Sequence, residues 1–285
     1  MIFNIMGGKE GWHVKDLLRA AQSLGFKAHV TDFRLISHSL AQPSKQAFEE
    51  AVCTIIRTMP PGSLEQVVFR MDVLHALQRQ GKKVLNPPRA LESAVDKFLA
   101  SELLQSHGLD IPHTFCCQDS DTAMEAFERF GKDIVVKPLF GAEGRGILRI
   151  EDEQLAWRVF RAIEKIGGVI YLQPYIKHPG WDLRIFILGD KVLGGMKRTA
   201  PQGAWMTNVA QGGKGEAYKL NSNLETIGIK ACKAVGAEIA GVDLILDENG
   251  KWLVLEVNAV PGWKAFAPVT GIDIAREILI YANHS

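Results

Sequence analysis

The sequence predicts an α/β protein, with a small βαβ domain at the N-terminus and an α+β part after it. In the first third of the chain, short apolar runs alternate with amphipathic helical segments, as in a parallel sheet with helices on its faces. The alternation stops at Asn86-Pro87-Pro88, because prolines interrupt regular structure. Beyond this point, turn signals such as Asn249-Gly250 join successive strands into hairpins.

The individual elements follow from the same patterns. Ser63 and Glu65 suit the start of a helix, because a hydroxyl can cap free N–H groups and a carboxylate complements the helix dipole. We expect three units, at residues 1–88, 89–176 and 177–285. Strands are predicted at residues 2–6, 27–33, 52–57, 82–86, 134–137, 146–150, 169–173, 183–188, 191–198, 241–246 and 251–258. Helices are predicted at residues 12–24, 63–80, 90–107, 122–130, 155–165, 224–234 and 272–283.

The composition excludes several functional classes. The chain has 285 residues, of which 47% are hydrophobic, and a formal net charge of +1, without the basic surplus that an electrostatic nucleic-acid binder needs. The four cysteines form no CxxC motif, so we expect free thiols in a reducing compartment. No run of eighteen apolar residues occurs, and the first residues lack a basic leader. The sequence therefore predicts a cytoplasmic protein that binds neither nucleic acid nor membrane.

A hairpin near the C-terminus carries the strongest chemical signal. If Asn249-Gly250 forms a two-residue turn, Asp243 lies directly opposite Glu256, and Asn258 follows on the same face. A three-residue turn would instead place the two carboxylates on opposite faces. Carboxylates about 5 Å apart repel each other unless a hard cation lies between them, and oxygen ligands favour Mg²⁺ or Mn²⁺ over zinc. The alternative is a half-exposed hairpin with scattered acids, although unpaired charge is unfavourable in such apolar strands.

A glycine-rich loop joins two other predicted strands. Gly141, Gly144 and Gly146 lie in this loop, where glycine lets backbone N–H groups approach phosphate oxygens. Strands flank the loop on both sides, so neither a P-loop nor a dinucleotide-binding motif fits, since each of those opens a helix. The loop is typical of a flap that closes over a nucleoside triphosphate. An ordinary flexible hairpin is the alternative.

Three basic residues lie within predicted strands. Lys137 ends the run Ile134-Val135-Val136, and a cation in such surroundings needs an anionic partner, for which phosphate is suitable. Asp182 and Arg184 share one face of a strand because they are two residues apart, and Arg198 lies on the next strand. Each residue could also be an ordinary solvated strand residue. Together they predict a site that neutralises a triphosphate and an acyl phosphate.

The basic strand residues, the glycine loop and the paired carboxylates of the hairpin occur along the chain in the order of a known family. The sequence resembles the ATP-grasp ligases of the RimK-like group, the alpha-L-glutamate ligase family. The resemblance runs from about residue 86 to the C-terminus and implies an ATP-grasp fold preceded by the small βαβ domain. It makes residues 89–176 the lid subdomain with the glycine flap, and residues 177–285 the subdomain with the metal site. The motifs are Lys97, Val135-Val136-Lys137, Gly141-x-x-Gly144-x-Gly146, Gln173-Pro174-Tyr175-Ile176, Asp182-Leu183-Arg184, Lys197-Arg198-Thr199-Ala200, Thr207-Asn208, Gly241-Val242-Asp243, Glu256-Val257-Asn258 and Pro261-Gly262.

The resemblance also implies a reaction. Such ligases transfer the γ-phosphoryl group of ATP to a carboxylate, and an amine then attacks the acyl phosphate to form an amide. This chemistry needs positioning and charge neutralisation more than a covalent nucleophile. The implied cofactors are ATP and Mg²⁺ or Mn²⁺, with two ions.

The roles implied by the resemblance fall into three groups. The metal ligands are Asp243, Glu256 and Asn258. The ATP-binding residues are Lys97 and Lys137 at the phosphates, Gly141, Gly144 and Gly146 in the flap, Pro174 and Tyr175 at the adenine, and Asp182 at the ribose. The residues at the transferring phosphoryl group and the substrate carboxylate are Arg184, Arg198 and Asn208.

Two departures from the family pattern bear on the substrates. Pro174 stands where the family often has an acidic residue, and residues 209–213 lack the basic residues of a ribosomal-protein-modifying RimK. Trp205 and Trp263 are expected to flank the cleft, where aromatic faces would stack on a flat substrate. The sequence is similar to RimK-like ligases of tetrahydromethanopterin biosynthesis. We therefore expect L-glutamate as the amine and a small pterin-like carboxylate as the acceptor.

Other functions stay open. Glutamylation of a ribosomal protein C-terminus and LysX-type ligation to an amino-group carrier protein share the same motifs. A carboxylate kinase would release acyl phosphate without consuming an amine, and a nucleotide-binding module would not need the metal ligands. A homo-oligomer is compatible with the sequence, which leaves the oligomeric state, the acceptor and the pathway open.

Overall fold

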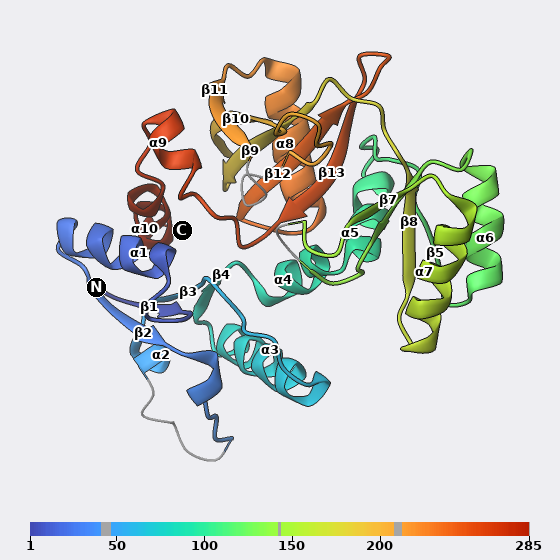
Figure 1. Ribbon diagram of the computed structural model, residues 1–285. Coiled ribbons are helices and arrows are strands. Elements are labelled where there is room, and N and C mark those ends of the chain that lie inside the picture. Colours follow the sequence, from blue (N-terminus) through green and yellow to red (C-terminus); the bar gives the residue numbers. More distant parts are fainter. Residues whose placement is uncertain (41–46, 142–143, 208–212, 285) are drawn as a thin grey trace.

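The computed structural model describes residues 1–40, 47–141, 144–207 and 213–284. In these ranges the chain forms three β-sheets with helices packed against them. Figure 1 shows the N-terminal sheet in blue to teal, a second sheet in green to yellow-green, and a third sheet in yellow through orange to red. The predicted mixed α/β class is confirmed. Each sheet lies within one of the ranges 1–88, 89–176 and 177–285, and the division into domains itself stays a prediction.

The N-terminal sheet is parallel, in the order β2-β1-β3-β4. Both of its faces are covered, because Ile5 of β1 packs in one cluster with Leu17 of α1, and Ile56 of β3 packs in another with Leu74 of α3. The strands are β1 (Ile2–Met6), β2 (Lys27–Thr31), β3 (Cys53–Ile56) and β4 (Lys83–Leu85). The helices are α1 (Trp12–Ser23), η1 (Phe33–Leu35), α2 (Ala47–Glu50) and α3 (Leu64–Arg79), the last capped by Ser63 as predicted.

The predicted helix over residues 90–107 is wrong in one respect, because the structure has two helices there. The first, α4 (Pro88–Val95), ends at Asp96, whose side chain accepts hydrogen bonds from the N–H groups of Phe98 and Leu99. Asp96 therefore caps the second helix, α5 (Lys97–Ser106). This break places Lys97 at the start of α5.

The second sheet is antiparallel, in the order β5-β8-β6-β7. Helices α6 and α7 pack against it through a cluster that contains Phe127, Phe160 and Ile134. The strands are β5 (Phe115–Cys117), β6 (Ile134–Lys137), β7 (Leu148–Ile150) and β8 (Ile170–Pro174), and the helices are α6 (Ser120–Arg129) and α7 (Glu153–Lys165). The predicted glycine loop falls between β6 and β7, and residues 142–143 of it lie outside the described ranges.

The third sheet is antiparallel, in the order β11-β10-β9-β12-β13. Alternate residues of β9 face different clusters, so that Ile185 packs toward α8 and Phe186 packs toward α9 and α10. The strands are β9 (Trp181–Leu188), β10 (Lys191–Thr199), β11 (Lys214–Tyr218), β12 (Ile239–Leu246) and β13 (Trp252–Asn258). The helices are α8 (Ser222–Ala234), α9 (Phe266–Thr270) and α10 (Ile274–His284). None of the helices in the described ranges has both the length and the apolar composition that a bilayer span requires.

The predicted two-residue turn between β12 and β13 is wrong. The N–H group of Asp247 bonds to the carbonyl of Lys251, so the loop holds three residues, with Gly250 at a positive φ of 78°. The register then shifts by one residue, and Asp243 pairs with Glu256 while Leu244 pairs with Val254. This β-bulge keeps the two carboxylates opposite each other.

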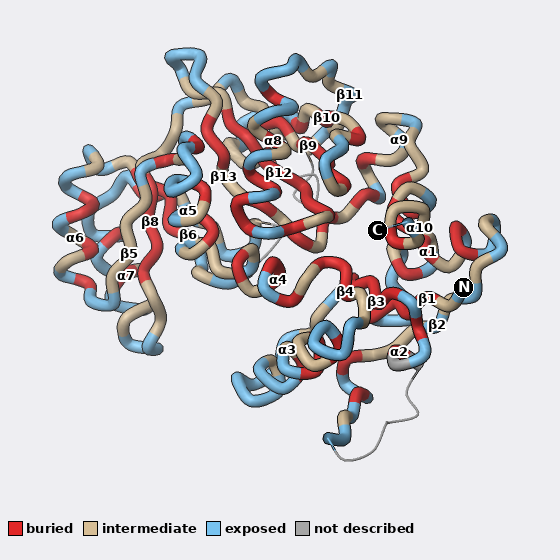
Figure 2. Tube along the Cα trace, turned by 180° about the vertical axis from the view of Figure 1, so that it is seen from behind, coloured by how far each residue is buried: buried red, intermediate tan, exposed pale blue. Residues whose placement is uncertain are grey.

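The N-terminal sheet is fastened to the third sheet by a buried amide. The side chain of Asn86 donates to the carbonyls of Ile239 and Ala259 and accepts from the N–H groups of Glu238 and Ile239. Figure 2 shows buried residues in red along the strands of both sheets and along α4 between them. In addition, each of two apolar clusters contains residues of both the N-terminal sheet and the third sheet.

Candidate active site

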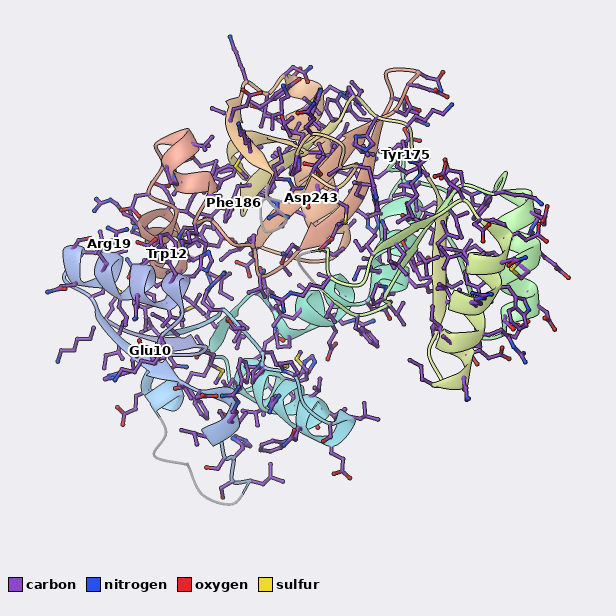
Figure 3. The ribbon with its side chains drawn as sticks, viewed as in Figure 1. Glu10, Trp12, Arg19, Tyr175, Phe186 and Asp243 are labelled. Atoms are coloured by element: carbon purple, nitrogen blue, oxygen red, sulfur yellow. The ribbon has the colours of Figure 1, made fainter. Side chains whose placement is uncertain are left out.

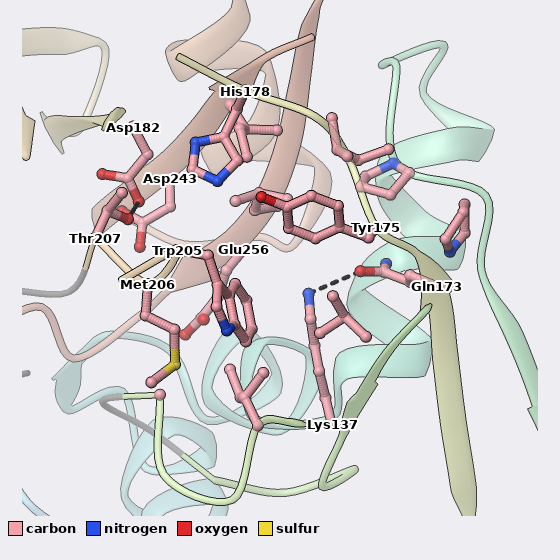
Figure 4. Close-up of a pocket in the computed structure, with 18 of the residues that line it drawn as sticks. Lys137, Gln173, Tyr175, His178, Asp182, Trp205, Met206, Thr207, Asp243 and Glu256 are labelled. Carbon is pink, nitrogen blue, oxygen red and sulfur yellow. Dashed lines mark hydrogen bonds between the residues drawn. The ribbon is translucent and has the colours of Figure 1, made fainter. Parts of the chain in front are cut away.

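A cleft lies between the second and the third sheet. One wall comes from β6 and β8, the other from β9, β12 and β13, and residues 205–207 border the opening. Figure 3 labels Asp243 on the third sheet and Tyr175 toward the second sheet, and Figure 4 shows the lining side chains between them. The predicted site residues that line the cleft are Lys97, Lys137, Gly144, Pro174, Tyr175, Asp182, Arg198, Asp243 and Glu256.

The central strands bring alternating charges onto one face. Asp243 of β12 lies opposite Arg184 of β9, and Arg198 of β10 lies opposite Asp182 of β9. Arg184 binds Asp243 with two bonds of 2.7 Å, and Arg198 binds Asp182 with bonds of 2.7 and 2.6 Å. Arg198 also lies 2.9 Å from Asp243. The shared face predicted for Asp182 and Arg184 is thus the base of a charge network.

This network fixes the charge of its members. Burial disfavours the carboxylate of Asp243, but Arg184 and Arg198 hold its pKa below the usual range. Likewise, Asp243 and Asp182 raise the pKa of Arg198 although burial works against its charge. Both oxygens of Asp182 are engaged, by Arg198 and by the hydroxyl of Thr207. The carboxylate of Asp182 therefore holds Arg198 in place, and the ribose contact implied by the resemblance stays a prediction.

Glu256 has the opposite environment. Among the described residues, no hydrogen bond or ion pair reaches its carboxylate. Burial, reinforced by the charge of Asp243, raises the pKa of Glu256, and Lys97 partly offsets this effect. Such a carboxylate is a ready ligand for a cation.

The donor set fits a hard cation. The carboxylates of Asp243 and Glu256 face each other across the hairpin. Asn258 ends the same strand and accepts a hydrogen bond from the N–H group of Val260. Among the described residues, no group of three or more His, Cys, Asp or Glu side chains is arranged so that it could hold a metal ion. Mg²⁺ bound by two carboxylates and one amide oxygen would need further oxygen ligands, such as phosphate oxygens.

Two lysines extend into the cleft without a carboxylate partner in the described ranges. The Nζ atom of Lys137 donates to the side-chain oxygen of Gln173 at 2.7 Å, and that of Lys97 donates to the carbonyl of Gly141 at 3.0 Å. Burial lowers the pKa of Lys137 to about 8 and also lowers the pKa of Lys97. Neutral partners leave both cations available to a polyanion.

The flap needs glycine for steric reasons. Gly144 and Gly146 have φ angles of 74° and 75°, which disfavour other residues. A Cβ atom at Gly146 would lie 2.8 Å from Cγ of Pro138. Gly141 precedes them, and residues 142–143 lie outside the described part. Asn208 also lies outside the described residues.

An aromatic group borders the end of the cleft near Pro174. The N–H group of Tyr175 bonds to the carbonyl of Asp133, and the guanidinium of Arg149 lies 3.7 Å from the centre of its ring. The ring centres of Trp205 and Tyr175 are 6.0 Å apart in an edge-on arrangement, and Figure 4 labels both side chains in the cleft. This arrangement suits a flat ring such as adenine.

Gln173 contacts Lys137 and Arg149 contacts Tyr175, although the sequence pattern indicated no role for either residue. Gln173 is buried in β8 and bonds to Lys137, Thr114 and Tyr171. A polar residue in the apolar run before Pro174 was a usable signal, because a buried amide must be hydrogen-bonded. Arg149 carried no comparable signal.

The placement predicted for Trp263 is wrong. Its side chain is fully buried, its indole N–H donates to Asp16 at 2.8 Å, and Arg57 lies over its ring. It therefore joins α1 to the C-terminal part and cannot stack on a substrate. Trp205, in contrast, lines the cleft.

Comparison with known proteins decides the family. The model of the RimK-like ATP-grasp domain matches residues 94–282. This chain belongs to the RimK-like ATP-grasp family. It is therefore an ATP-grasp ligase, of a family that binds ATP and metal ions.

The relatives of this RimK-like chain include named ligases. It is 32% identical to "Tetrahydromethanopterin:alpha-L-glutamate ligase" of Methanosarcina acetivorans, over 96% of each chain. It is 34% identical to "Probable alpha-L-glutamate ligase" of Legionella pneumophila strain Corby, over 73% of this chain and 70% of the other.

Solved structures share the fold. The ligase PsnB with its minimal precursor, Mg and ADP superposes with a TM-score of 0.78 at 18% identity, over 98% of this chain and 97% of the other. A RimK domain protein of Sphaerobacter thermophilus gives 0.76 at 18% identity, over 99% and 100%. The ATP-grasp fold predicted from the sequence is thereby confirmed.

Proposed function

We propose that this ligase activates a carboxylate as an acyl phosphate and joins it to the amine of L-glutamate. The γ-phosphoryl group of ATP is transferred to the carboxylate and ADP is left. The amine then attacks the acyl carbon, the C–O bond to phosphate breaks, and an amide and inorganic phosphate are formed. The observation that carries this proposal is Glu256, a carboxylate without a partner among the described residues, opposite Asp243 and close to two lysines.

The phosphates of ATP are bound by the cations of the cleft. Lys97 and Lys137 contact only neutral oxygens in the described structure, so a triphosphate can take their charge without breaking an ion pair. The backbone of Gly144 and Gly146 closes over the phosphates, because residues with positive φ expose N–H groups. These residues orient the γ-phosphoryl group toward the acceptor carboxylate.

The arginines neutralise the transferring group. Arg198 is held by Asp182, and Arg184 is held by Asp243, so both guanidinium groups are fixed before the reaction. Preorganised charge of this kind stabilises a phosphoryl group in transfer. Asn208 is a further proposed contact of this group.

Metal binding uses the remaining oxygen ligands. Asp243, Glu256 and Asn258 would hold Mg²⁺, which supplies charge neutralisation between the ATP phosphates. Asp243 accepts three bonds from Arg184 and Arg198 and has a further lone-pair direction free. We propose two ions, as in the family pattern, and Mn²⁺ as an alternative.

Support for the substrates comes from the relatives. Two relatives, each 32% identical to this chain, are named for tetrahydromethanopterin and L-glutamate. We therefore propose a small pterin-like carboxylate as acceptor, with Trp205 near the cleft as its aromatic contact. The absence of basic residues from positions 209–213 argues against an acidic protein tail.

The test is a set of acceptors offered with ATP, Mg²⁺ and L-glutamate. We expect release of ADP and a product heavier by one glutamate residue, measured by mass spectrometry, with a pterin carboxylate. Efficient modification of a ribosomal-protein C-terminal peptide or of an amino-group carrier protein, with no reaction of small carboxylates, would overturn the acceptor assignment.

A further inference from the structure

A buried guanidinium lies outside the cleft just described. Arg57 directly follows β3 and is 6% exposed, its Nη2 atom donates to the carbonyl of Pro261 at 2.9 Å, and its Cζ atom lies 4.4 Å from the ring centre of Trp263. Its Nε atom is buried without a hydrogen-bond partner. No carboxylate of the described residues pairs with it. A buried ion without a counter-ion is unfavourable, and an arginine stays charged at neutral pH.

Arg57 lies where ligands commonly bind in parallel sheets. The strands β1 and β3 are neighbours. The chain leaves β1 through α1 and leaves β3 through α3, and these two helices cover opposite faces of the sheet. Ligands bind beyond the carboxyl ends of strands at such a switch point. The backbone of Gly7, which directly follows β1, is also close to Arg57, because a Cβ atom placed on Gly7 would lie 3.3 Å from Cβ of Arg57.

Further hydrogen-bond donors surround the same point. Helix α1 begins after Gly11 without a side-chain cap and without an acidic residue in its first turn, so its N–H groups and dipole favour an anion. His13 lies in that turn, and its Nε2 atom accepts the N–H group of Trp263 at 3.0 Å. Burial, with the charge of Arg57, lowers the pKa of His13 to about 4. The neutral ring therefore carries its proton on Nδ1 as a donor.

The group borders the proposed reaction centre. Pro261 binds Arg57 through its carbonyl. A Cβ atom at Gly241 would lie 3.1 Å from Cβ of Pro261 and 3.5 Å from Nε of Arg184. Pro261 and Gly241 therefore lie between Arg57 and the ion pair of Arg184 and Asp243.

We propose that Arg57, with His13 and the first N–H groups of α1, binds a non-reacting carboxylate of one of the two substrates. The inference rests on the proposed function, because the reaction consumes one carboxylate and L-glutamate brings two that do not react. The shared chemistry is a carboxylate, whether it belongs to glutamate or to the acceptor.

The experiment compares Arg57→Met with a matched control, Arg70→Met. Arg70 is also buried, also donates to a proline carbonyl, that of Pro60, and lies on α3 at the opposite face of the sheet. Thermal unfolding is measured without ligand and with L-glutamate, glutarate or a pterin carboxylate. KM is measured for each substrate by ADP release. Arg57→Lys serves as a second variant that keeps the charge.

For Arg57→Met we expect the melting temperature without ligand to be unchanged or higher, because a buried charge is removed. We also expect it to lose the ligand-induced shift, and KM for one substrate to rise about tenfold or more. The substrate whose KM rises identifies the bound carboxylate. Arg70→Met should keep the wild-type shift, and Arg57→Lys should keep part of it.

The inference is overturned if Arg57→Met, or Arg57→Lys where the first variant does not fold, keeps the full shift and both KM values. It is also overturned if wild-type protein binds none of the three carboxylates. A third outcome separates this inference from the proposed function. If the carboxylates bind through Arg57 but no combination of acceptor and amine releases ADP, the proposed function is wrong and the carboxylate site is supported.

Discussion

Asp243 and Glu256 lie directly opposite each other on β12 and β13, although the loop between these strands has three residues. A regular hairpin with this loop would pair Asp243 with Leu255. The bulge at that position adds one residue to β13 and restores the pairing. Bulges of this kind re-aim side chains next to active sites, so the irregular strand keeps both carboxylates on the face of the cleft.

The two acids should respond differently to removal of their charge. We expect Glu256→Gln to lower turnover by about 10²-fold or more, with stability unchanged or raised by ~1 kcal/mol because repulsion from Asp243 is relieved. Asp243→Asn should lower stability by about 3–5 kcal/mol, because Arg184 and Arg198 lose a buried partner. Urea unfolding and ADP release measure both effects.

The control for this comparison is Glu248→Gln, at an exposed position of the same hairpin loop. It should leave stability and turnover unchanged. Near-normal turnover of Glu256→Gln would contradict the metal assignment.

Lys137 should make stability depend on pH in the alkaline range. Burial lowers its pKa from 10.5 to about 8, so between these values the unfolded chain binds more protons than the folded protein. The free energy of unfolding attributable to Lys137 should therefore rise as pH increases from about 8 toward 10.5. Lys137→Met should remove this contribution and weaken ADP binding.

Urea titrations at a series of pH values, with isothermal titration of Mg-ADP, measure these effects. Lys165→Met, at an exposed end of α7, is the matched control. An unchanged pH profile for Lys137→Met would show that this lysine has no unusual environment.

Trp263 should matter for stability rather than for substrate binding. Trp263→Ala is expected to lower the free energy of unfolding by about 3–5 kcal/mol, because it leaves a cavity and breaks the bond to Asp16. Its affinity for ADP should be unchanged. The half-exposed Trp157 on α7 offers a control, whose alanine variant should change stability by about 0.5 kcal/mol or less. A stable Trp263→Ala variant with weakened acceptor binding would contradict this account.

Periodicity predicted much of the site. The spacing of Asp182 and Arg184 placed them on one face of a strand, and the structure shows both in the charge network. The pairing of Asp243 with Glu256 was also predicted, but through a turn that the structure does not contain. Local spacing succeeds here because strand alternation is a short-range property.

Contacts between residues that are far apart in the chain could not be predicted from the sequence. Trp263 is buried by α1, some 250 residues earlier in the chain, and Arg57 meets Pro261 across 204 residues. No local pattern reports such contacts. The division between α4 and α5 at Asp96 could have been predicted. An aspartate before a helical run is a recognisable N-cap, and the sequence contains that signal.

The proposed reaction depends on activation of the carboxylate as an acyl phosphate. The direct measurement incubates the protein with ATP, Mg²⁺ and a pterin carboxylate in the absence of amine, with hydroxylamine as a trap. We expect a hydroxamate and an equal amount of ADP, both greatly reduced in Glu256→Gln. Release of AMP and pyrophosphate, with hydroxamate formed through an adenylate, would contradict it.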